Sequence, residues 1–246
     1  MNTKNEVLQN CTVEGLIVKL PNVQLERKLY QDVAKALELI GGKWKGGKIF
    51  GFVFAEDPTD LLRQISNGES RNIKKEFQFF ATPPAIAAHL VELADIKPDD
   101  IILEPSAGQG AIIEAILGKY PKANITAVEL MELNCNILIK KGYNVEKADF
   151  ITTPFQPIFT KIIANPPFSN NLDIDHIRRM YEVCIPGGGR IVSIASKHWQ
   201  GSGNRKEVDF KNWLDSIDSQ VYEIEAGAFK ESGTMIRSVI IVINKG

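Results

Sequence analysis

Cysteine is scarce in this chain of 246 residues, which holds three: Cys11, Cys135 and Cys184. They lie far apart, their number is odd, and none forms a Cys-x-x-Cys pair. This pattern argues against a disulfide framework and favours a reducing compartment, so we expect a cytoplasmic protein. The three histidines are equally scattered, and we therefore predict no metal site.

A long apolar run is also missing. The longest, residues 238–244 (SVIIVIN), has the length of a strand and is too short to cross a bilayer. The first six residues are polar and lack the apolar stretch of a secretory signal. These two absences predict a protein without membrane attachment.

Neither sign of charge is in excess, because 29 lysines and arginines oppose 30 aspartates and glutamates and give a formal net charge of −1. This balance excludes a generally basic nucleic-acid coat and an acidic disordered tail. Any polyanionic partner must therefore be held by a local patch. An apolar fraction of 44% at this length is enough for a substantial core without disulfides.

Residues 1–70 are predicted to form a small α+β appendage, with a helix and a hairpin. Apolar residues recur at helical spacing over 23–40, and Gly41-Gly42 ends that pattern. Gly46-Gly47 separates two short aromatic-rich runs within residues 43–54, which is typical of a β-hairpin. A further helix is predicted over 59–67. The appendage is a candidate contact for a substrate or a partner.

Residues 71–246 alternate between short strands and helices, which predicts a mostly parallel seven-stranded sheet with helices on both faces. The last two strands have no helix between them, so we expect them to pair antiparallel. Strands are predicted at 101–104, 124–129, 143–145, 161–164, 190–195, 220–226 and 236–243, and helices at 111–120, 131–141, 172–184 and 207–217.

Ligands of such sheets bind at the carboxyl ends of the strands. After the first strand comes Glu104-Pro-Ser-Ala-Gly-Gln-Gly110, whose glycines permit a tight turn close to a ligand. Ile113 replaces the third glycine of the dinucleotide fingerprint, which disfavours an NAD-dependent reductase. An acid just before the loop would repel a pyrophosphate and would suit a ligand with a cationic end.

Acidic residues also follow the next two predicted strands. Glu129 is placed to accept hydrogen bonds from ribose hydroxyls. Asp149-Phe150 pairs a carboxylate with an aromatic ring, a combination that can accept from an adenine amino group and contact its ring.

The most specific motif, Asn165-Pro166-Pro167-Phe168, follows the fourth strand. Its prolines fix the backbone and remove two N–H donors. What remains is a corner rich in acceptors, the Asn165 side-chain oxygen and the Pro166 carbonyl. Such a corner can hold a planar amino group by both hydrogens, while Phe168 stacks on the ring that bears it.

Residues 77–246 resemble the class I S-adenosylmethionine-dependent methyltransferases with a Rossmann-like fold. More narrowly, the chain is similar to the gamma-order adenine-N6 DNA methyltransferases, in which a Phe-Thr-Pro-Pro-like block precedes the glycine loop and an Asn-Pro-Pro-aromatic motif follows it. Here the block is residues 79–84 (FFATPP).

The resemblance implies S-adenosylmethionine as the cofactor and assigns roles to matching residues. Those expected to bind the cofactor are Phe80, Thr82, Pro83, Glu104, Ser106, Gly108, Gly110, Glu129, Asp149, Phe150 and Asn165. Those expected to be catalytic are Asn165, Pro166, Pro167 and Phe168. Substrate contacts are expected at Phe229, a second candidate for stacking, and at Lys197, Trp199, Lys43 and Lys45 in local basic–aromatic patches.

The function that follows is methyl transfer to the exocyclic amino group of adenine in DNA after base flipping, as in a restriction-modification system. DNA is then the expected partner. The motif alone leaves other acceptors open, namely RNA adenine and a protein glutamine amide. A modification subunit that needs a specificity or restriction partner is a further alternative, because no dedicated base-reading domain is apparent.

Overall fold

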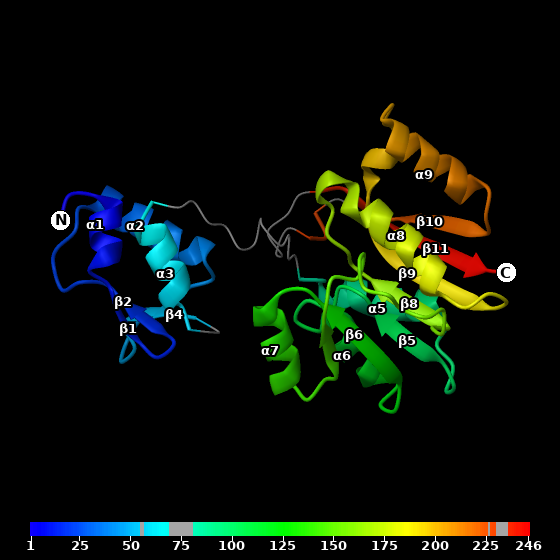
Figure 1. Ribbon diagram of the computed structural model, residues 1–246, viewed down its shortest axis with the longest axis horizontal. Helices are drawn as coiled ribbons and strands as arrows, with labels where there is room; N and C mark the ends of the chain where they lie inside the picture. Colours follow the sequence, from blue (N-terminus) through cyan, green and yellow to red (C-terminus); the bar gives the residue numbers. More distant parts are fainter. Residues whose placement is uncertain (55–56, 69–80, 226, 230–235) are drawn as a thin grey trace. The chain divides into compact units, whose positions relative to one another are not determined.

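The computed structural model describes residues 1–54, 57–68, 81–225, 227–229 and 236–246 (Figure 1). The chain divides into two compact units, Met1–Gln78 and Phe79–Gly246. The predicted boundary at residue 70 lies outside the described residues, so the proposed division into 1–70 and 71–246 stays a prediction.

The first unit is an α+β structure built on a four-stranded antiparallel sheet of order β1-β2-β4-β3. Its strands are β1 (Thr12–Glu14), β2 (Ile17–Lys19), β3 (Lys43–Lys45) and β4 (Gly51–Val53), and its described helices are α1 (Lys4–Gln9), α2 (Arg27–Leu39) and α3 (Thr59–Ser66). Strands β3 and β4 form the predicted hairpin. The sequence patterns did not predict α1, β1 and β2, and the two strands extend the sheet from the two strands of the hairpin to four.

The second unit contains a seven-stranded sheet of order β10-β11-β9-β8-β5-β6-β7. Five strands are parallel, and β11 pairs antiparallel with both β9 and β10, which confirms the predicted fold class. The strands are β5 (Ile101–Glu104), β6 (Asn124–Glu129), β7 (Val145–Lys147), β8 (Lys161–Ala164), β9 (Gly189–Ser196), β10 (Ser219–Glu223) and β11 (Ser238–Lys245).

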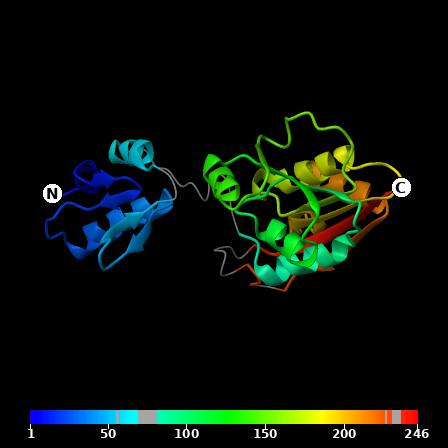
Figure 2. The same cartoon turned by 90° about the horizontal axis from the view of Figure 1, so that it is seen from below.

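Helices cover both faces of this sheet, and Figure 2 shows α8 and α5 on opposite sides of it. The α-helices of the unit are α5 (Pro84–Ala94), α6 (Ala111–Lys119), α7 (Glu132–Lys140), α8 (Leu172–Val183) and α9 (Arg205–Asp215). Alternate residues of β9 point to different cores: Ile191 and Ala195 pack with α8 and α9, whereas Val192 and Ile194 pack with α5 and α6. Because both faces are buried, the strands read as continuous apolar runs.

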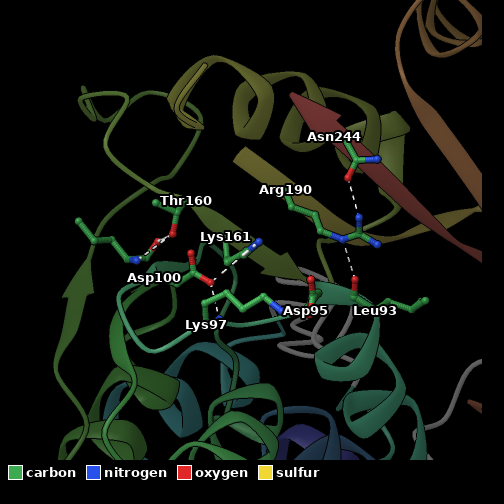
Figure 3. A network of polar contacts seen from close by, with 9 residues as sticks. Leu93, Asp95, Lys97, Asp100, Thr160, Lys161, Arg190 and Asn244 are labelled. Carbon is green, nitrogen blue, oxygen red and sulfur yellow. Dashed lines mark hydrogen bonds and ion pairs between the residues drawn. The ribbon is translucent and has the colours of Figure 1, made fainter. Parts of the chain in front are cut away.

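Polar contacts tie the amino ends of the parallel strands together (Figure 3). Arg190 at the start of β9 donates from Nε to the Leu93 carbonyl of α5 at 2.7 Å and from Nη1 to Asn244 Oδ1 of β11 at 2.6 Å. The Lys161 ammonium of β8 lies 3.9 Å from Asp100, which precedes β5. These contacts fasten the end of the sheet opposite to the one expected to hold a ligand.

We expect Arg190→Ala to lower the free energy of unfolding of the second unit by about 1.5–3 kcal/mol, because it removes charge-assisted hydrogen bonds from a half-buried site. Urea titration followed by tryptophan emission measures this in a Trp44→Phe background, where Trp199 and Trp213 report on the second unit alone. The matched control is Lys97→Ala, which removes an exposed ion pair with Asp95 in the same region and should leave the midpoint nearly unchanged. Equal midpoints for both variants would contradict the assigned role.

Candidate active site

The carboxyl ends of β5, β6 and β8 lie at one edge of the sheet because these strands are parallel neighbours. The chain proceeds from β5 outward through β6 to β7, and then returns to place β8 on the other side of β5. The strand order therefore reverses between β5 and β8, and this reversal is where open α/β sheets bind ligands. Glu104 ends β5, and Asn165 directly follows β8.

The glycine loop after β5 is fastened to the end of β6. The Ala107 amide donates to the Val128 carbonyl at 3.0 Å, and the Gly108 amide donates to Glu129 Oε2 at 2.7 Å. Gly108 and Gly110 have φ angles of 54° and 89°, a region that favours glycine. A Cβ on Gly110 would lie 2.9 Å from Leu138 Cδ2, so this glycine also permits the close packing of α7.

Glu104 and Glu129 place two carboxyl groups at the ends of adjacent strands. Glu104 is 1% exposed, and burial followed by the nearby Glu129 charge raises its pKa well above the ordinary value. Burial also raises the pKa of Glu129, opposed by hydrogen bonds from the Met131 and Gly108 amides. Within the described part of the chain, Glu104 Oε2 has no hydrogen-bond partner. A cationic group of a ligand would satisfy that acceptor.

A hydrogen bond joins the two most specific motifs of the sequence. Asn165 Nδ2 donates to Thr82 Oγ1 at 3.1 Å, although 83 positions separate the residues along the chain. Thr82 is 8% exposed, so its hydroxyl is held within the structure and can orient the Asn165 amide. Pro83 follows as the N-cap residue of α5, which anchors the Thr-Pro-Pro block to that helix.

The two predicted stacking residues, Phe168 and Phe229, belong to the same apolar cluster, on the face of the sheet that α5 and α6 cover. They are 8% and 3% exposed. Both rings are packed in this core rather than open to solvent. Their contact with a target base stays a prediction.

The remaining cofactor residues have mixed surroundings. Asp149 Oδ1 accepts a hydrogen bond from the Ile151 amide at 2.9 Å. The Phe150 ring is buried in the opposite core, 5.7 Å from the His176 ring between centroids. Ser106 is half-buried in the glycine loop. Phe80 lies outside the described residues, and the roles of Asp149 and Phe150 in cofactor binding stay predictions.

The substrate-binding candidates in the second unit are engaged in structural contacts. Lys197 Nζ lies 2.6 Å from Glu223 Oε1, and the Trp199 ring is 5% exposed and packs edge-on against Phe210. The other two candidates, Lys43 and Lys45, are exposed on the first unit. Their predicted roles in substrate binding remain untested.

Sequence reasoning missed two polar contacts that position the chain just after Phe168. Asp173 on α8 is fully buried, and its Oδ2 accepts hydrogen bonds from the Ser196 amide at 2.7 Å and the Ser196 hydroxyl at 2.8 Å. Asn171 Nδ2 donates to Glu207 Oε1 of α9 at 2.8 Å. The loops that follow β8 and β9 are thereby joined to each other and to α9. An acid in the first turn of a helix is usually exposed, so no local signal distinguished Asp173.

Among the described residues, no helix has the length and apolarity needed to cross a membrane. The same residues contain no group of three or more metal-ligating side chains placed to hold an ion.

Known proteins with a similar sequence are named as ribosomal RNA methyltransferases. No protein-family model matches the chain. It is 26% identical over 106 residues to the ribosomal RNA small subunit methyltransferase A of Synechococcus sp. (strain CC9605), and 27% identical over 105 residues to the protein of the same name in Prochlorococcus marinus (strain MIT 9313). Each match covers 39% of this chain. The chain therefore spans 38% of the length of the first relative and 37% of the length of the second.

Solved structures show the same fold at low identity. A dimethyladenosine transferase from Plasmodium falciparum matches with a TM-score of 0.52 and 22% identity, over 68% of this chain and 63% of that one. The M protein of the type I restriction enzyme EcoKI matches with a TM-score of 0.55 and 13% identity, over 91% of this chain and 55% of that one.

The second unit therefore has the Rossmann-like fold of the class I S-adenosylmethionine-dependent methyltransferases. The comparisons support S-adenosylmethionine as the cofactor. The residues present fit this cofactor, because a buried unpartnered carboxylate oxygen at Glu104 suits its ammonium group and Glu129 ends the neighbouring strand.

We expect Glu104→Gln to raise the melting temperature at pH 8 by a few degrees in the absence of cofactor. A carboxyl group whose pKa is raised by folding contributes stability below its unfolded pKa of about 4.5, and that stability is lost as the pH rises through the folded pKa. The amide cannot ionise, so the variant avoids this loss, and the two melting curves should converge as the pH falls toward about 4.5.

Scanning calorimetry from pH 5 to 8 measures the difference. Glu146→Gln, which makes the same chemical change at an exposed position, is the control. If the Glu104→Gln variant is no more stable than the parent at pH 8, folding does not raise the pKa of the Glu104 carboxyl group.

Proposed function

We propose that this protein transfers a methyl group from S-adenosylmethionine to the exocyclic amino group of adenine in nucleic acid, with DNA as the primary substrate. The hydrogen bond between Thr82 and Asn165 is the observation that carries this proposal. It joins the acceptor-rich corner after β8 to the Thr-Pro-Pro block, beside the buried acid that ends β5. The corner that can hold an amino group and the carboxyl group that can accept from a cationic ligand thus both lie where the strand order reverses, at the ends of β8 and β5.

The cofactor would be held by residues at the ends of three strands. Glu104 Oε2 would accept from its ammonium group, and the loop with Gly108 and Gly110 would pass close to the same end. Each Glu129 oxygen already accepts one backbone amide, from Gly108 or Met131, and a carboxylate has about four acceptor positions in total. Glu129 can therefore also accept the ribose hydroxyls.

When bound, S-adenosylmethionine supplies an electrophilic methyl group. Asn165 Oδ1 and the Pro166 carbonyl would accept the two hydrogens of the target amino group and place its nitrogen in line for attack. An aromatic amine is a poor nucleophile because its lone pair is delocalised into the ring. The two acceptors favour a more tetrahedral nitrogen and stabilise the positive charge that develops there.

A base within a duplex cannot reach this corner, so the target base would be flipped out and stacked on Phe168. Flipping costs a few kcal/mol of unstacking, which contacts within the pocket must offset. Phe168 is 8% exposed, so the stacked state requires its ring to be uncovered when substrate binds.

RNA adenine is the second candidate acceptor. The two curated relatives are named as ribosomal RNA methyltransferases, whereas the EcoKI M protein is named as part of a type I restriction enzyme. The block at residues 79–84 (FFATPP) favours DNA, because it is similar to the block of the gamma-order DNA methyltransferases. A specificity or restriction partner is part of the proposal as well. The chain has a net charge of only −1, so its composition gives no excess of positive charge for binding nucleic acid.

We expect Asn165→Ala to abolish methyl transfer while leaving cofactor affinity largely intact, because the amide contacts the acceptor nitrogen. Thr82→Val should lower kcat about tenfold by freeing the Asn165 side chain, which corresponds to about 1.4 kcal/mol. Thr82→Ser keeps the hydroxyl and serves as the matched control, with activity close to that of the parent. Transfer of tritiated methyl groups and cofactor calorimetry provide the two readouts, and normal turnover by Asn165→Ala would refute the assigned role.

The substrate is identified by transfer of labelled methyl groups to separate pools of DNA, RNA and protein, followed by nucleoside analysis. We expect label in N6-methyladenine of DNA. Label confined to RNA would select the second candidate. Label in protein alone would overturn the assignment to nucleic acid and indicate a glutamine amide acceptor.

A further inference from the structure

The hairpin of the first unit separates its side chains onto two faces. Trp44 of β3 pairs with Phe52 of β4, which is fully buried in the core that the helices cover. Lys43 and Lys45 alternate with Trp44 and pair with Val53 and Gly51. The two lysines therefore project from the opposite face of an edge strand.

Positive charge on this hairpin is not neutralised locally. Residues 43–53 contain three lysines, Lys43, Lys45 and Lys48, and no acidic residue. All three are exposed, and none takes part in the ion pairs found among the described residues. Glu14, on β1 at the opposite edge of the same sheet, is paired with Lys19 at 2.6 Å. A run of lysines on an edge strand is complementary to a line of phosphates.

An exposed aromatic side chain accompanies this charge. Phe50 is 69% exposed and has a φ angle of 41°, a conformation that a bulky side chain rarely adopts. Its ring centroid lies 5.2 Å from that of Trp44, with the planes at 72°, so Trp44 supports it from one side. Exposure of a large apolar ring in a strained backbone contributes little to folding. Such outliers concentrate at functional sites.

We propose that residues 43–53, the lysine–aromatic hairpin, bind a single strand of nucleic acid. Lys43, Lys45 and Lys48 contact successive phosphates, and Phe50 stacks on an unpaired base. Positively charged grooves with stacking rings bind single strands in this way without reading sequence. The substrate identity rests on the proposed function, whereas the binding itself does not.

The hairpin would add affinity for nucleic acid that two of the predicted contacts in the second unit do not provide. Lys197 in that unit is paired with Glu223 and Trp199 is buried, so neither is an open contact for nucleic acid. Because both units belong to one chain, binding by the hairpin raises the effective concentration of substrate at the transfer site. A hairpin variant should therefore raise KM for nucleic acid and leave kcat unchanged.

Fluorescence anisotropy of the full chain with a labelled single-stranded 20-nucleotide DNA tests the charge contribution. We expect Lys43→Gln/Lys45→Gln to weaken binding at least tenfold and to reduce the slope of log affinity against log salt by about 1.4, since about 0.7 is lost per phosphate contact on a single strand. Lys28→Gln/Lys35→Gln makes the same charge change on exposed residues of α2. In this control we expect less than half of the hairpin variant's change in log affinity, and less than half of its change in the salt slope. Equal effects of the two double variants would overturn the proposal, because net charge alone would then explain binding.

Phe50→Asn tests the stacking contribution without a folding penalty, because asparagine tolerates a positive φ angle better than phenylalanine. We expect an unchanged or higher melting temperature together with at least a fivefold loss of affinity, as expected when one base loses its stacking partner. Unchanged affinity in this variant would refute stacking on Phe50. The same DNA in duplex form should bind more weakly than the single strand, and equal binding would contradict recognition of an unpaired base.

These outcomes separate the two proposals. If the hairpin variants bind and methylate nucleic acid with parental KM while Asn165→Ala is inactive, the hairpin proposal fails and the methyl-transfer proposal stands. If the hairpin variants lose affinity but the parent transfers no methyl group to any pool, the methyl-transfer proposal fails and the hairpin proposal stands.

Discussion

A buried carboxyl group at the end of β5 is the constraint around which the site is arranged. Glu104 is 1% exposed, has an oxygen without a partner among the described residues, and lies near a second buried acid. Burying such a group costs folding free energy unless a ligand or a proton compensates. Its presence is understandable if the rest of the second unit supplies the stability and a cationic ligand supplies the compensation.

The sheet supplies that stability because helices cover both of its faces and polar contacts join its strands at the end remote from the site. Arg190, Lys161 and Asp100 join the amino ends of the strands, where nothing needs to move. The carboxyl ends carry instead the loops after β5, β6, β8 and β9. Hydrogen bonds such as those from Ser196 to Asp173 keep these loops in a defined arrangement. Rigidity at one end thus supports a precise arrangement of loops at the other.

The nearly neutral net charge of −1 leaves any contact with a polyanion to local groups of lysines. Three of the 29 lysines and arginines lie in the short hairpin of the first unit, where no acid lies between residues 43 and 53. A few phosphate contacts of this kind give weak binding with a strong dependence on salt.

The sequence alone was sufficient for the features that repeat locally. Alternating apolar runs and helical periodicity predicted the seven strands and the helices α6 to α9 of the second unit, because an element that is buried on one or both faces carries a regular apolar pattern in its own residues. They did not predict α5 (Pro84–Ala94). The motifs at strand ends predicted where a ligand would bind, since parallel strands must bring those ends to one edge. In the first unit, three-residue strands show almost no periodicity, so β3 and β4 were predicted from the Gly46-Gly47 turn between them, whereas β1 and β2 have no such Gly-Gly pair and were missed.

Tertiary structure alone decided which of those residues are available and which are partnered. Trp199 and Phe150 look like surface aromatics beside polar motifs, yet the packing of α8 and α9 buries both rings. Thr82 and Asn165 are 83 positions apart, and Asp173 and Ser196 are 23 apart, so no local pattern could pair them. Burial and long-range hydrogen bonds depend on how elements pack, and packing depends on the whole set of side chains rather than on any one segment.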